Sequence, residues 1–442
     1  MNIYALSSGR GPSGIAIIRL SGSEALKISK IITKKENFSS NKINLCKFFD
    51  PKDSSIIDEG LMLCFLAPNS FTGDDLVEFH THGSNAVIST FLKVLSEQKN
   101  TRMAEPGEFT KIAFQNNKIN LIEAESIGDL IHSETELQRK QALNFVQGNA
   151  SKYYENLREK LVKSLAYIEA KIDFAEDDLP KSVLNEVHKS ILEIHSEIKK
   201  ILEDQKIGEK IREGFKVSIL GEVNSGKSSL LNLLSKREVA IVSEEAGTTR
   251  DVIEAYLNID GYPVILADTA GIRETSNVVE KKGINLALEK SKESDLKIVM
   301  IDSTSSKISP EIEKLIVEDS IVVLNKSDLP NKKKITIKKN KTLDISVQEN
   351  TNIDLLIKEI KNKLSDKYIT PKNILITRER HRDKLEACMK EINKFLKKDQ
   401  NVDLETAAED LRQATRHLGS IVGKIDVEEI LGSIFKDFCI GK

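Results

Sequence analysis

The spacing of apolar residues changes along the chain, and residues 1–116 carry the spacing of strands. The apolar run Ile15–Leu20 follows a turn rich in Gly and Ser, and residues Leu76–His82 alternate apolar with polar side chains. Alternation with a period of two is typical of a half-buried strand. A turn further on predicts the start of a helix, with Glu108 or Thr110 as its cap. We therefore predict an N-terminal α+β domain.

Two other regions, residues 117–213 and 371–442, carry the spacing of helices. Apolar residues of the first recur three and four positions apart, at Leu157, Leu161, Leu165, Ile168 and Ile172, and again at Val187, Ile191, Ile194, Ile198 and Ile201. The second region repeats this spacing at Leu385, Cys388, Ile392 and Phe395, and then at Leu411, Leu418, Val422 and Ile425. Long amphipathic helices joined by short loops are most often members of a bundle. We predict one all-helical bundle domain built from both regions, with residues 214–370 inserted between them.

The inserted region opens with a predicted strand, a glycine-bracketed turn and a helix. The apolar run Lys216–Leu220 leads into Gly221–Ser229, which reads Gly-Glu-Val-Asn-Ser-Gly-Lys-Ser-Ser, and Leu230–Leu234 begins the helix. The turn matches the phosphate-binding pattern G-x-x-x-x-G-K-[ST] in the context that gives the pattern its meaning. Backbone N–H groups of such a loop wrap the phosphates, Lys227 reaches the outer ones, and the Ser228 hydroxyl coordinates Mg²⁺.

Two tetrapeptides further along identify the nucleotide. Asn325–Asp328 and Asp268–Gly271 each end an apolar run, so both lie at the carboxyl ends of strands, where open α/β sheets bind ligands. Asp328 can accept two N–H bonds from the edge of guanine, whereas adenine presents the wrong pattern and leaves the carboxylate unpaired. Asp268 is placed to hold Mg²⁺ through water, and Gly271 to meet the γ-phosphate. In this order the motifs predict a Ras-like P-loop GTPase domain with a mostly parallel sheet.

Composition narrows the class of protein. At 442 residues the chain is too long for one core, and about three domains are expected. Charged residues make up 30% and the net charge is −2, which neither indicates nor excludes a nucleic acid partner. No apolar run approaches the roughly 20 residues that span a bilayer, and the N-terminus lacks the segments of an export signal. Cys46, Cys64, Cys388 and Cys439 form no C-x-x-C pair. We therefore expect a cytoplasmic protein without membrane association.

Some patterns admit two interpretations. Glu78, His80 and His82 share one face of a predicted strand and could bind a metal, although a polar strand face is favoured because no fourth ligand is evident. Residues 11–14 match the G-x-x-G of an RNA-binding KH loop, on a single match within a turn-rich segment. The lysines at 332–334, 338 and 339 form either a solvated loop or a contact to a phosphate backbone.

With these motifs in this order, the chain resembles the MnmE (TrmE) family of tRNA-modification GTPases along its whole length. The segments that carry the resemblance are Gly9–Gly22, Ser70–Gly83, Pro106–Thr110, Ala113–Asn120 and the terminal Cys439–Lys442, which is similar to the family's Cys-x-Gly-Lys. The resemblance implies an N-terminal dimerisation and folate-binding domain at residues 1–116. It implies a helical domain in two parts, at 117–213 and 371–442, and a GTPase domain at 214–370.

The resemblance also implies a ligand and partners. The chain would form a homodimer through its N-terminal domain and bind 5-formyltetrahydrofolate or a related tetrahydrofolate. Arg19, Glu78, Lys118 and Lys442 would hold the folate, because cations suit its carboxylates and a carboxylate suits the N–H edge of the pterin. A heterotetramer with MnmG, an FAD- and NADH-dependent enzyme, would add a carboxymethylaminomethyl or aminomethyl group to C5 of the wobble uridine of certain tRNAs. The folate would supply the one-carbon unit.

The residues expected to contact GTP comprise the phosphate loop, a switch segment and the loops around the base. They are Asn224, Ser225, Gly226, Lys227, Ser228, Ser229, Ser243, Glu244, Glu245, Ala246, Gly247, Thr248, Thr249, Asp268, Thr269, Ala270, Gly271, Asn325, Lys326, Ser327, Asp328 and Ser346. The resemblance implies that Thr249 joins Ser228 on Mg²⁺.

The resemblance further implies a hydrolysis mechanism without an arginine finger. K⁺ would take the place of the finger, held by Asn224, Ser243, Glu245 and Thr248, and would stabilise the charge that develops during hydrolysis. Ile272 stands where Ras-like proteins carry the water-orienting Gln, and Glu274 matches the family's replacement for it. The chain has Val223 where the family usually has Pro. Since Pro would fix φ, a looser loop and a weaker K⁺ site are expected.

Other classes of protein stay open at this stage. Ribosome-assembly GTPases of the Era or EngA type share the Gly-Thr-Thr-Arg-Asp switch, but they usually carry a KH domain or a second GTPase domain, and the helical spacing after Pro371 does not match KH. A third class is a GTPase that acts only in signalling or as a scaffold. In such a protein the folate-binding motifs would have no ligand. Cys439, near Lys436 and Lys442, is a candidate nucleophile, set against the commoner buried structural thiol.

Overall fold

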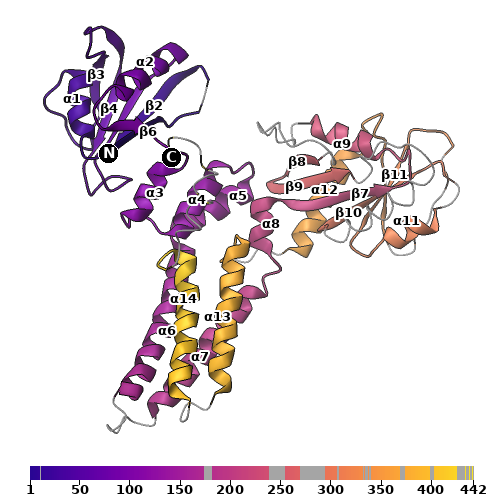
Figure 1. The fold of residues 1–442 in the computed structure, drawn as a ribbon. Coiled ribbons are helices and arrows are strands. Elements are labelled where there is room, and N and C mark those ends of the chain that lie inside the picture. Colours follow the sequence, from indigo (N-terminus) through magenta and orange to yellow (C-terminus); the bar gives the residue numbers. More distant parts are fainter. Residues whose placement is uncertain are drawn as a thin grey trace, which may run out of the picture. The chain divides into compact units, whose positions relative to one another are not determined.

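The structure is a computed structural model that divides into two compact units (Figure 1). The first unit contains Met1–Gly128, Phe145–Ala166 and Leu411–Lys442, and the second contains Asp129–Asn144 and Tyr167–Asp410. Within them the structure describes residues 1–9, 11–173, 182–237, 254–268, 294–305, 308–331, 333, 337, 340–368, 374–398, 403–425, 434, 438 and 441, with only the backbone at 182, 183, 254, 268 and 311.

A six-stranded sheet forms the core of the first unit, with strand order β3-β4-β5-β2-β1-β6. Its strands are β1 Asn2–Leu6, β2 Ser13–Ser21, β3 Asn44–Phe49, β4 Ile56–Phe65, β5 Leu76–Gly83 and β6 Thr101–Met103. The β1–β6 pair is parallel and the other pairs are antiparallel. The strands predicted at 15–20 and 76–82 are β2 and β5, so the α+β prediction for this region is confirmed.

Helices α1 (Ala25–Thr33) and α2 (Asn85–Ser96) cover one face of this sheet. The rings of Phe48, Phe79 and Phe91 meet there with centroids 4.9–5.7 Å apart, in tilted and edge-to-face arrangements that aromatic pairs prefer. Arg19 and Glu78 are direct partners across β2 and β5 and project from the opposite face, because side chains alternate along a strand. These two of the four candidate folate residues therefore lie on the face opposite α1 and α2.

The start of helix α3 (Glu108–Gln115) differs from the prediction. Gly107 is its N-cap, with φ of 67°, and no side chain caps the helix. The Glu108 carboxylate accepts the backbone N–H of Glu105 and pairs with Arg102 instead, while Thr110 is fully buried. The predicted cap was wrong because a glycine that tolerates the left-handed conformation already occupies the cap position.

The end of the chain returns to the first unit's sheet. The Ser7 hydroxyl, just after β1, donates a 2.8 Å hydrogen bond to the carbonyl of Gly441. Phe438 packs against Ala124 of α4 (Leu121–Ile131), and a Cβ on Gly128 would come within 3.1 Å of its ring. The same unit holds parts of α6 (Asn149–Asp173) and α14 (Leu404–Val422). Lys424, two residues after α14, forms an ion pair of 3.0 Å with Glu155 of α6.

In the second unit, α7 (Ser182–Leu202) packs on α13 (Glu379–Lys397). The predicted helical faces are buried, with Val187, Ile191, Ile194 and Ile198 on α7 and Leu385, Cys388, Ile392 and Phe395 on α13. The buried Arg382 guanidinium joins these helices to α8 (Ile207–Glu213) through a bidentate pair with Glu209, at 3.1 and 2.7 Å. Among the described residues, no helix combines the length and the hydrophobicity needed to cross a membrane.

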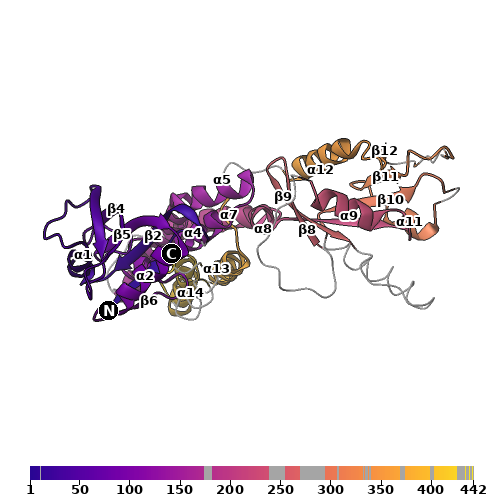
Figure 2. The ribbon, with the colours of Figure 1, turned by 90° about the horizontal axis from the view of Figure 1, so that it is seen from above.

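A second six-stranded sheet begins directly after α8, with strand order β12-β11-β10-β7-β9-β8 (Figures 1 and 2). Its strands are β7 Phe215–Gly221, β8 Glu254–Ile259, β9 Tyr262–Asp268, β10 Leu296–Asp302, β11 Ile321–Asn325 and β12 Thr342–Asp344, and every pair except β8–β9 is parallel. Helices α9 (Lys227–Ser235) and α12 (Ile353–Lys367) pack on one face, and α11 (Pro310–Leu315) packs on the other. The mostly parallel sheet predicted for residues 214–370 is confirmed.

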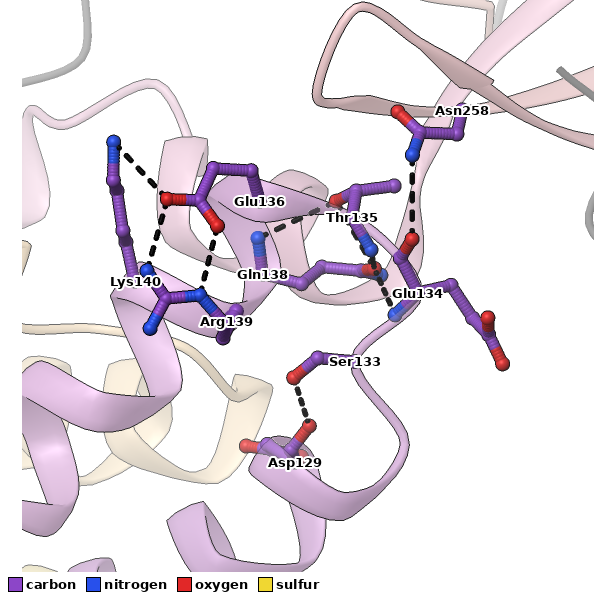
Figure 3. Close-up of polar contacts among 9 residues, drawn as sticks. All are labelled: Asp129, Ser133, Glu134, Thr135, Glu136, Gln138, Arg139, Lys140 and Asn258. Carbon is purple, nitrogen blue, oxygen red and sulfur yellow. Dashed lines mark hydrogen bonds and ion pairs between the residues drawn. The ribbon is translucent and has the colours of Figure 1, made fainter.

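Helix α5 (Glu136–Val146) begins against the turn between β8 and β9 (Figure 3). The Asn258 amide donates to the Glu134 carbonyl at 3.4 Å, and the Leu137 N–H donates to the Gly261 carbonyl at 3.3 Å. Leu137 also packs against the hydrophobic core of the sheet. This part of the helical region is thus docked on the nucleotide domain through a hairpin, which is defined here as residues 254–268.

Candidate functional site

The turn between β7 and α9 has the backbone of an anion-binding loop. Asn224 and Gly226 both adopt left-handed conformations, with φ of 62° and 99°. A Cβ added to Gly226 would lie 2.2 Å from the Asn325 side-chain nitrogen, and one added to Gly221 would lie 2.3 Å from the Met300 carbonyl. The loop therefore needs glycine at both ends because its backbone is pressed against the ends of β10 and β11.

Lys227 is the first residue of α9, and its side chain reaches back to this loop. Its side chain is almost fully buried, and its ammonium donates to the carbonyls of Gly221 and Glu222 at 3.0 and 2.7 Å. Ser228 and Ser229 are exposed at the start of α9, where the helix terminus carries partial positive charge. This arrangement offers a cation, hydroxyls and backbone N–H groups to a phosphate.

The Asn325 side chain connects its own turn, at the carboxyl edge of the sheet, with the phosphate loop and with the loop that follows β12. Its amide nitrogen donates to the Ser225 carbonyl of the phosphate loop at 2.8 Å, and its amide oxygen accepts the Val347 N–H at 3.2 Å. The Ser327 N–H donates to the Ile345 carbonyl at 3.0 Å. Ser346 is buried between these loops, whereas Asp328 is exposed. The structure thus brings the predicted base-binding turn next to the phosphate loop.

One residue of this region, Asp302 at the end of β10, was missed by reasoning from the sequence. Its carboxylate pairs with the Lys326 ammonium at 2.5 Å and accepts the N–H and hydroxyl of Thr304 at 2.9 and 2.7 Å. Burial favours the neutral carboxyl, but the bonds from Lys326 and Thr304 outweigh burial and lower the pKa of Asp302 below its usual range. The signal available was its position, since Asp302 ends an apolar run at the same sheet edge as Asn325.

Several predicted residues lie outside the described part of the chain. They are the switch residues Ser243, Glu244, Glu245, Ala246, Gly247, Thr248 and Thr249, the residues Thr269, Ala270 and Gly271, the candidate water-orienting Glu274, and the terminal Cys439 and Lys442. Asp268 is the last residue of β9, and only its backbone is described. Their predicted roles stay predictions.

In the first unit the structure brings together two of the four predicted folate residues. The Arg19 guanidinium donates to the Glu78 carboxylate at 2.8 Å, and its central carbon lies 5.9 Å from the centre of the Phe71 ring. His80 approaches the other Glu78 oxygen at 3.5 Å. The result is a charged and aromatic cluster on the face of the sheet opposite α1 and α2, where Phe71 also packs against the cluster that contains Phe109 of α3.

The other two predicted folate residues lie in different segments of the chain. The Lys118 ammonium donates to the Pro68 carbonyl at 2.8 Å. Gly441 is held against β1, where a Cβ on it would come within 2.2 Å of the Leu6 carbonyl. Gly441 is thus fixed beside Leu6 at the end of β1, and Lys442 lies outside the described residues.

The histidines of β5 show the contacts of a polar strand face. The His82 ring nitrogen Nδ1 lies 2.8 Å from the Asp58 carboxylate, and His80 lies beside Glu78. Over the described ranges, no group of three or more His, Cys, Asp or Glu residues is arranged to hold a metal ion.

Two protein-family models match the chain and together cover nearly all of it. The model described as "GTP-binding protein TrmE N-terminus" matches residues 2–118, and the one described as "MnmE helical domain" matches residues 121–439. The second match begins before the phosphate loop and ends after it, so it spans the inserted nucleotide domain.

Curated relatives match over the full length. The chain is 55% identical to "tRNA modification GTPase MnmE" of Pelagibacter ubique (strain HTCC1062), with all of both chains covered. It is 43% identical to the protein of the same name from Rickettsia bellii (strain RML369-C), with 100% of this chain and 99% of the relative covered. Era of Aquifex aeolicus is 27% identical over 40% of this chain and 66% of that one, but a TM-score of 0.25 is too low for its structure to inform the fold.

The full-length identity and both family models agree with the order of the motifs and with the geometry of the phosphate loop. The chain is a GTPase and belongs to the MnmE family of tRNA modification GTPases.

Proposed function

We propose that this chain hydrolyses GTP within a complex that modifies C5 of the wobble uridine of certain tRNAs. The observation that carries the nucleotide part is the Asn325 side chain, which ties the phosphate loop to the turn that holds Lys326, Ser327 and Asp328. A nucleotide whose phosphates lie on the first loop would reach Asp328 with its base.

Each loop residue has a role in this proposal. Lys227 exchanges its carbonyl partners for the outer phosphates, and Ser228, joined by Thr249, coordinates Mg²⁺, which would neutralise phosphate charge. Asp328 accepts two N–H bonds from guanine. Asp328 is exposed in this structure, so the guanine of a bound nucleotide can reach its carboxylate.

K⁺ fits the same loop. The Asn224 side chain is exposed and offers a carbonyl oxygen, and its backbone is left-handed with φ of 62°. Oxygens from Ser243, Glu245 and Thr248 would complete the site, and the cation would supply the positive charge of the missing arginine finger. Glu274 would orient the attacking water.

The Arg19–Glu78 cluster supports a folate site in the first unit. An arginine guanidinium suits a glutamate carboxylate of the folate, and a carboxylate suits the N–H edge of the pterin. Phe71 adds an aromatic surface beside Arg19, and Gly441, which precedes Lys442 in the chain, accepts a hydrogen bond from Ser7 in the same unit. Reduced folate would bring the one-carbon unit, and the FAD- and NADH-dependent partner MnmG would join the chain in a heterotetramer.

Exposed apolar residues of the same sheet support dimerisation. Leu45 and Leu61 are direct partners across β3 and β4, and they are 63% and 36% exposed. Ile15 of β2 is 64% exposed. By strand alternation Leu45 and Leu61 project from the face opposite α1 and α2, and Ile15 lies at the irregularity of β2 between Ser13 and Ala16. An exposed apolar strip of this kind marks an interaction site, and we assign it to a second copy of the chain.

The nucleotide proposal is tested by changing Asp328 to Asn. An amide can donate to the C2 oxygen of xanthine but cannot accept the N–H pair of guanine, so Asp328→Asn should lose GTP hydrolysis and gain XTP hydrolysis, each by about 100-fold. The wild-type chain measured with both nucleotides is the control. Unchanged GTP turnover in the variant would show that Asp328 does not recognise the base.

The cation proposal needs only a change of salt. Replacing K⁺ by Na⁺ at constant ionic strength should slow hydrolysis severalfold or more, measured as phosphate release. Equal rates in the two salts would remove K⁺ from the mechanism.

A further inference from the structure

Asp302, which forms the last register pair of β10 with Asn325, and the next two residues, Ser303 and Thr304, form a brace along the base-binding turn Asn325–Asp328. The Ser303 N–H donates to the Asn325 carbonyl and the Ser303 hydroxyl donates to the Lys326 carbonyl, both at 2.9 Å. The Ser303 carbonyl accepts the Lys333 N–H, also at 2.9 Å. Ser303, directly after β10, thus fixes the first two residues of the turn and the segment that follows the turn.

The brace also fixes one side chain of the turn, Lys326. The two oxygens of Asp302 have separate partners: one accepts both bonds from Thr304, and the other takes the Lys326 ammonium at 2.5 Å. The Thr304 bonds set the orientation of the carboxylate, so its second oxygen points in one direction. A flexible lysine stem is thereby held at both its backbone and its ammonium.

The backbone of Lys326 needs this support. Its φ of 62° is a left-handed conformation that residues other than Gly, Asn and Asp rarely adopt. Lys326 stands between Asn325, which holds the phosphate loop, and Asp328, the proposed reader of guanine. A change in its backbone would turn Asp328 relative to the phosphate loop.

We infer that Asp302 is a positioning residue for nucleotide recognition: by pairing with Lys326 it fixes the turn Asn325–Asp328 and so sets GTP affinity and the preference for guanine. The inference rests on the proposed GTP site and adds to it a residue outside the sequence motifs. Its physical basis is preorganisation. A lysine side chain that is already ordered loses less conformational entropy when the nucleotide binds.

The test is Asp302→Asn, which keeps the shape and removes the charge. The Kd and the KM for GTP should rise about tenfold, kcat at saturating GTP should stay within about twofold, and the preference for GTP over ATP should fall. Asp302→Glu, which keeps the charge, should recover part of the KM. Titration with fluorescent GTP and ATP analogues and steady-state phosphate release give these values.

A matched control is Asp319→Asn. Asp319 lies in the same domain and pairs with Lys367 at 3.5 Å, but its side chain is 59% exposed, against 20% for Asp302, and its partner Lys367 belongs to none of the motifs. It should leave affinity, kcat and thermal midpoint unchanged.

Three results would overturn the inference: a GTP affinity of Asp302→Asn within about twofold of the wild type, an equal loss of GTP and ATP affinity together with a lower thermal midpoint, or no recovery in Asp302→Glu. A wild-type chain that binds no GTP would instead contradict the proposed function.

Discussion

At the scale of single residues, the nucleotide loop depends on backbone conformations that a side chain would disturb. Gly226 combines a φ of 99° with a neighbour, the Asn325 amide nitrogen, that a Cβ would approach to 2.2 Å. Any substitution there displaces the amide that ties the phosphate loop to the base-binding turn.

We therefore expect Gly226→Ala to weaken GTP binding by more than about tenfold, and to lower the thermal midpoint because a strained left-handed residue costs roughly 1–3 kcal/mol. Gly14→Ala is the control, since a Cβ there would meet no atom within 4 Å. Fluorescent nucleotide titration and scanning calorimetry measure both effects. Wild-type affinity in Gly226→Ala would show that the loop tolerates a shift of Asn325.

Prediction from the sequence succeeded for residues whose chemistry is specified by a motif. It failed for residues whose contacts depend on how the strands align in the folded chain. The pattern around Lys227 and the turn at Asn325 could be recognised because their functions demand particular residue types in order. Asp302 could not, because its pairing with Lys326 depends on how β10 aligns with β11. The cap of α3 failed for a local reason, the left-handed glycine in front of it.

At the scale of elements, apolar periodicity predicted the strands and helices that bury one face. It gave no indication that α5 begins against the β8–β9 hairpin, because that docking is made largely by polar groups. The Gln138 side chain supports this contact indirectly. Its oxygen accepts the N–H groups of Thr135 and of Glu134, the residue whose carbonyl bonds Asn258 of the hairpin, and its nitrogen donates to the Arg212 carbonyl of α8, all three bonds of Gln138 at 3.1 Å.

Gln138→Ala should therefore loosen this joint by about 1–2 kcal/mol, because it leaves several backbone groups without their partner. Peptides covering α5 and the hairpin should exchange amide hydrogen roughly 5–30 times faster, measured by mass spectrometry. Lys140→Ala on the same helix removes only an exposed pair with Glu136 and should change exchange little (Figure 3). Equal exchange in the two variants would contradict a role for Gln138 in the joint.

At the scale of the whole molecule, the exposed apolar strip of Ile15, Leu45 and Leu61 calls for a partner. Under the proposed homodimer, Leu61→Glu places a charge on this strip and should give a monomer at micromolar concentration where the wild type sediments as a dimer, as measured by sedimentation equilibrium. Leu192→Glu is the control, because Leu192 is 46% exposed on α7 and lies outside the strip. A Leu61→Glu chain that stays dimeric would assign the strip to another partner.

The central claim, that this GTPase serves modification of the wobble uridine, is tested most directly by the nucleosides of cellular tRNA. Bulk tRNA is digested and analysed by mass spectrometry from cells with the gene, without it, and without it but carrying the wild-type or the Gly226→Ala chain. We predict that C5-aminomethyl-type uridines vanish without the gene, that unmodified or 2-thio-only uridines replace them, and that only the wild-type chain restores them. Unchanged tRNA in cells that accumulate unjoined ribosomal subunits would contradict the claim and favour a ribosome-assembly GTPase.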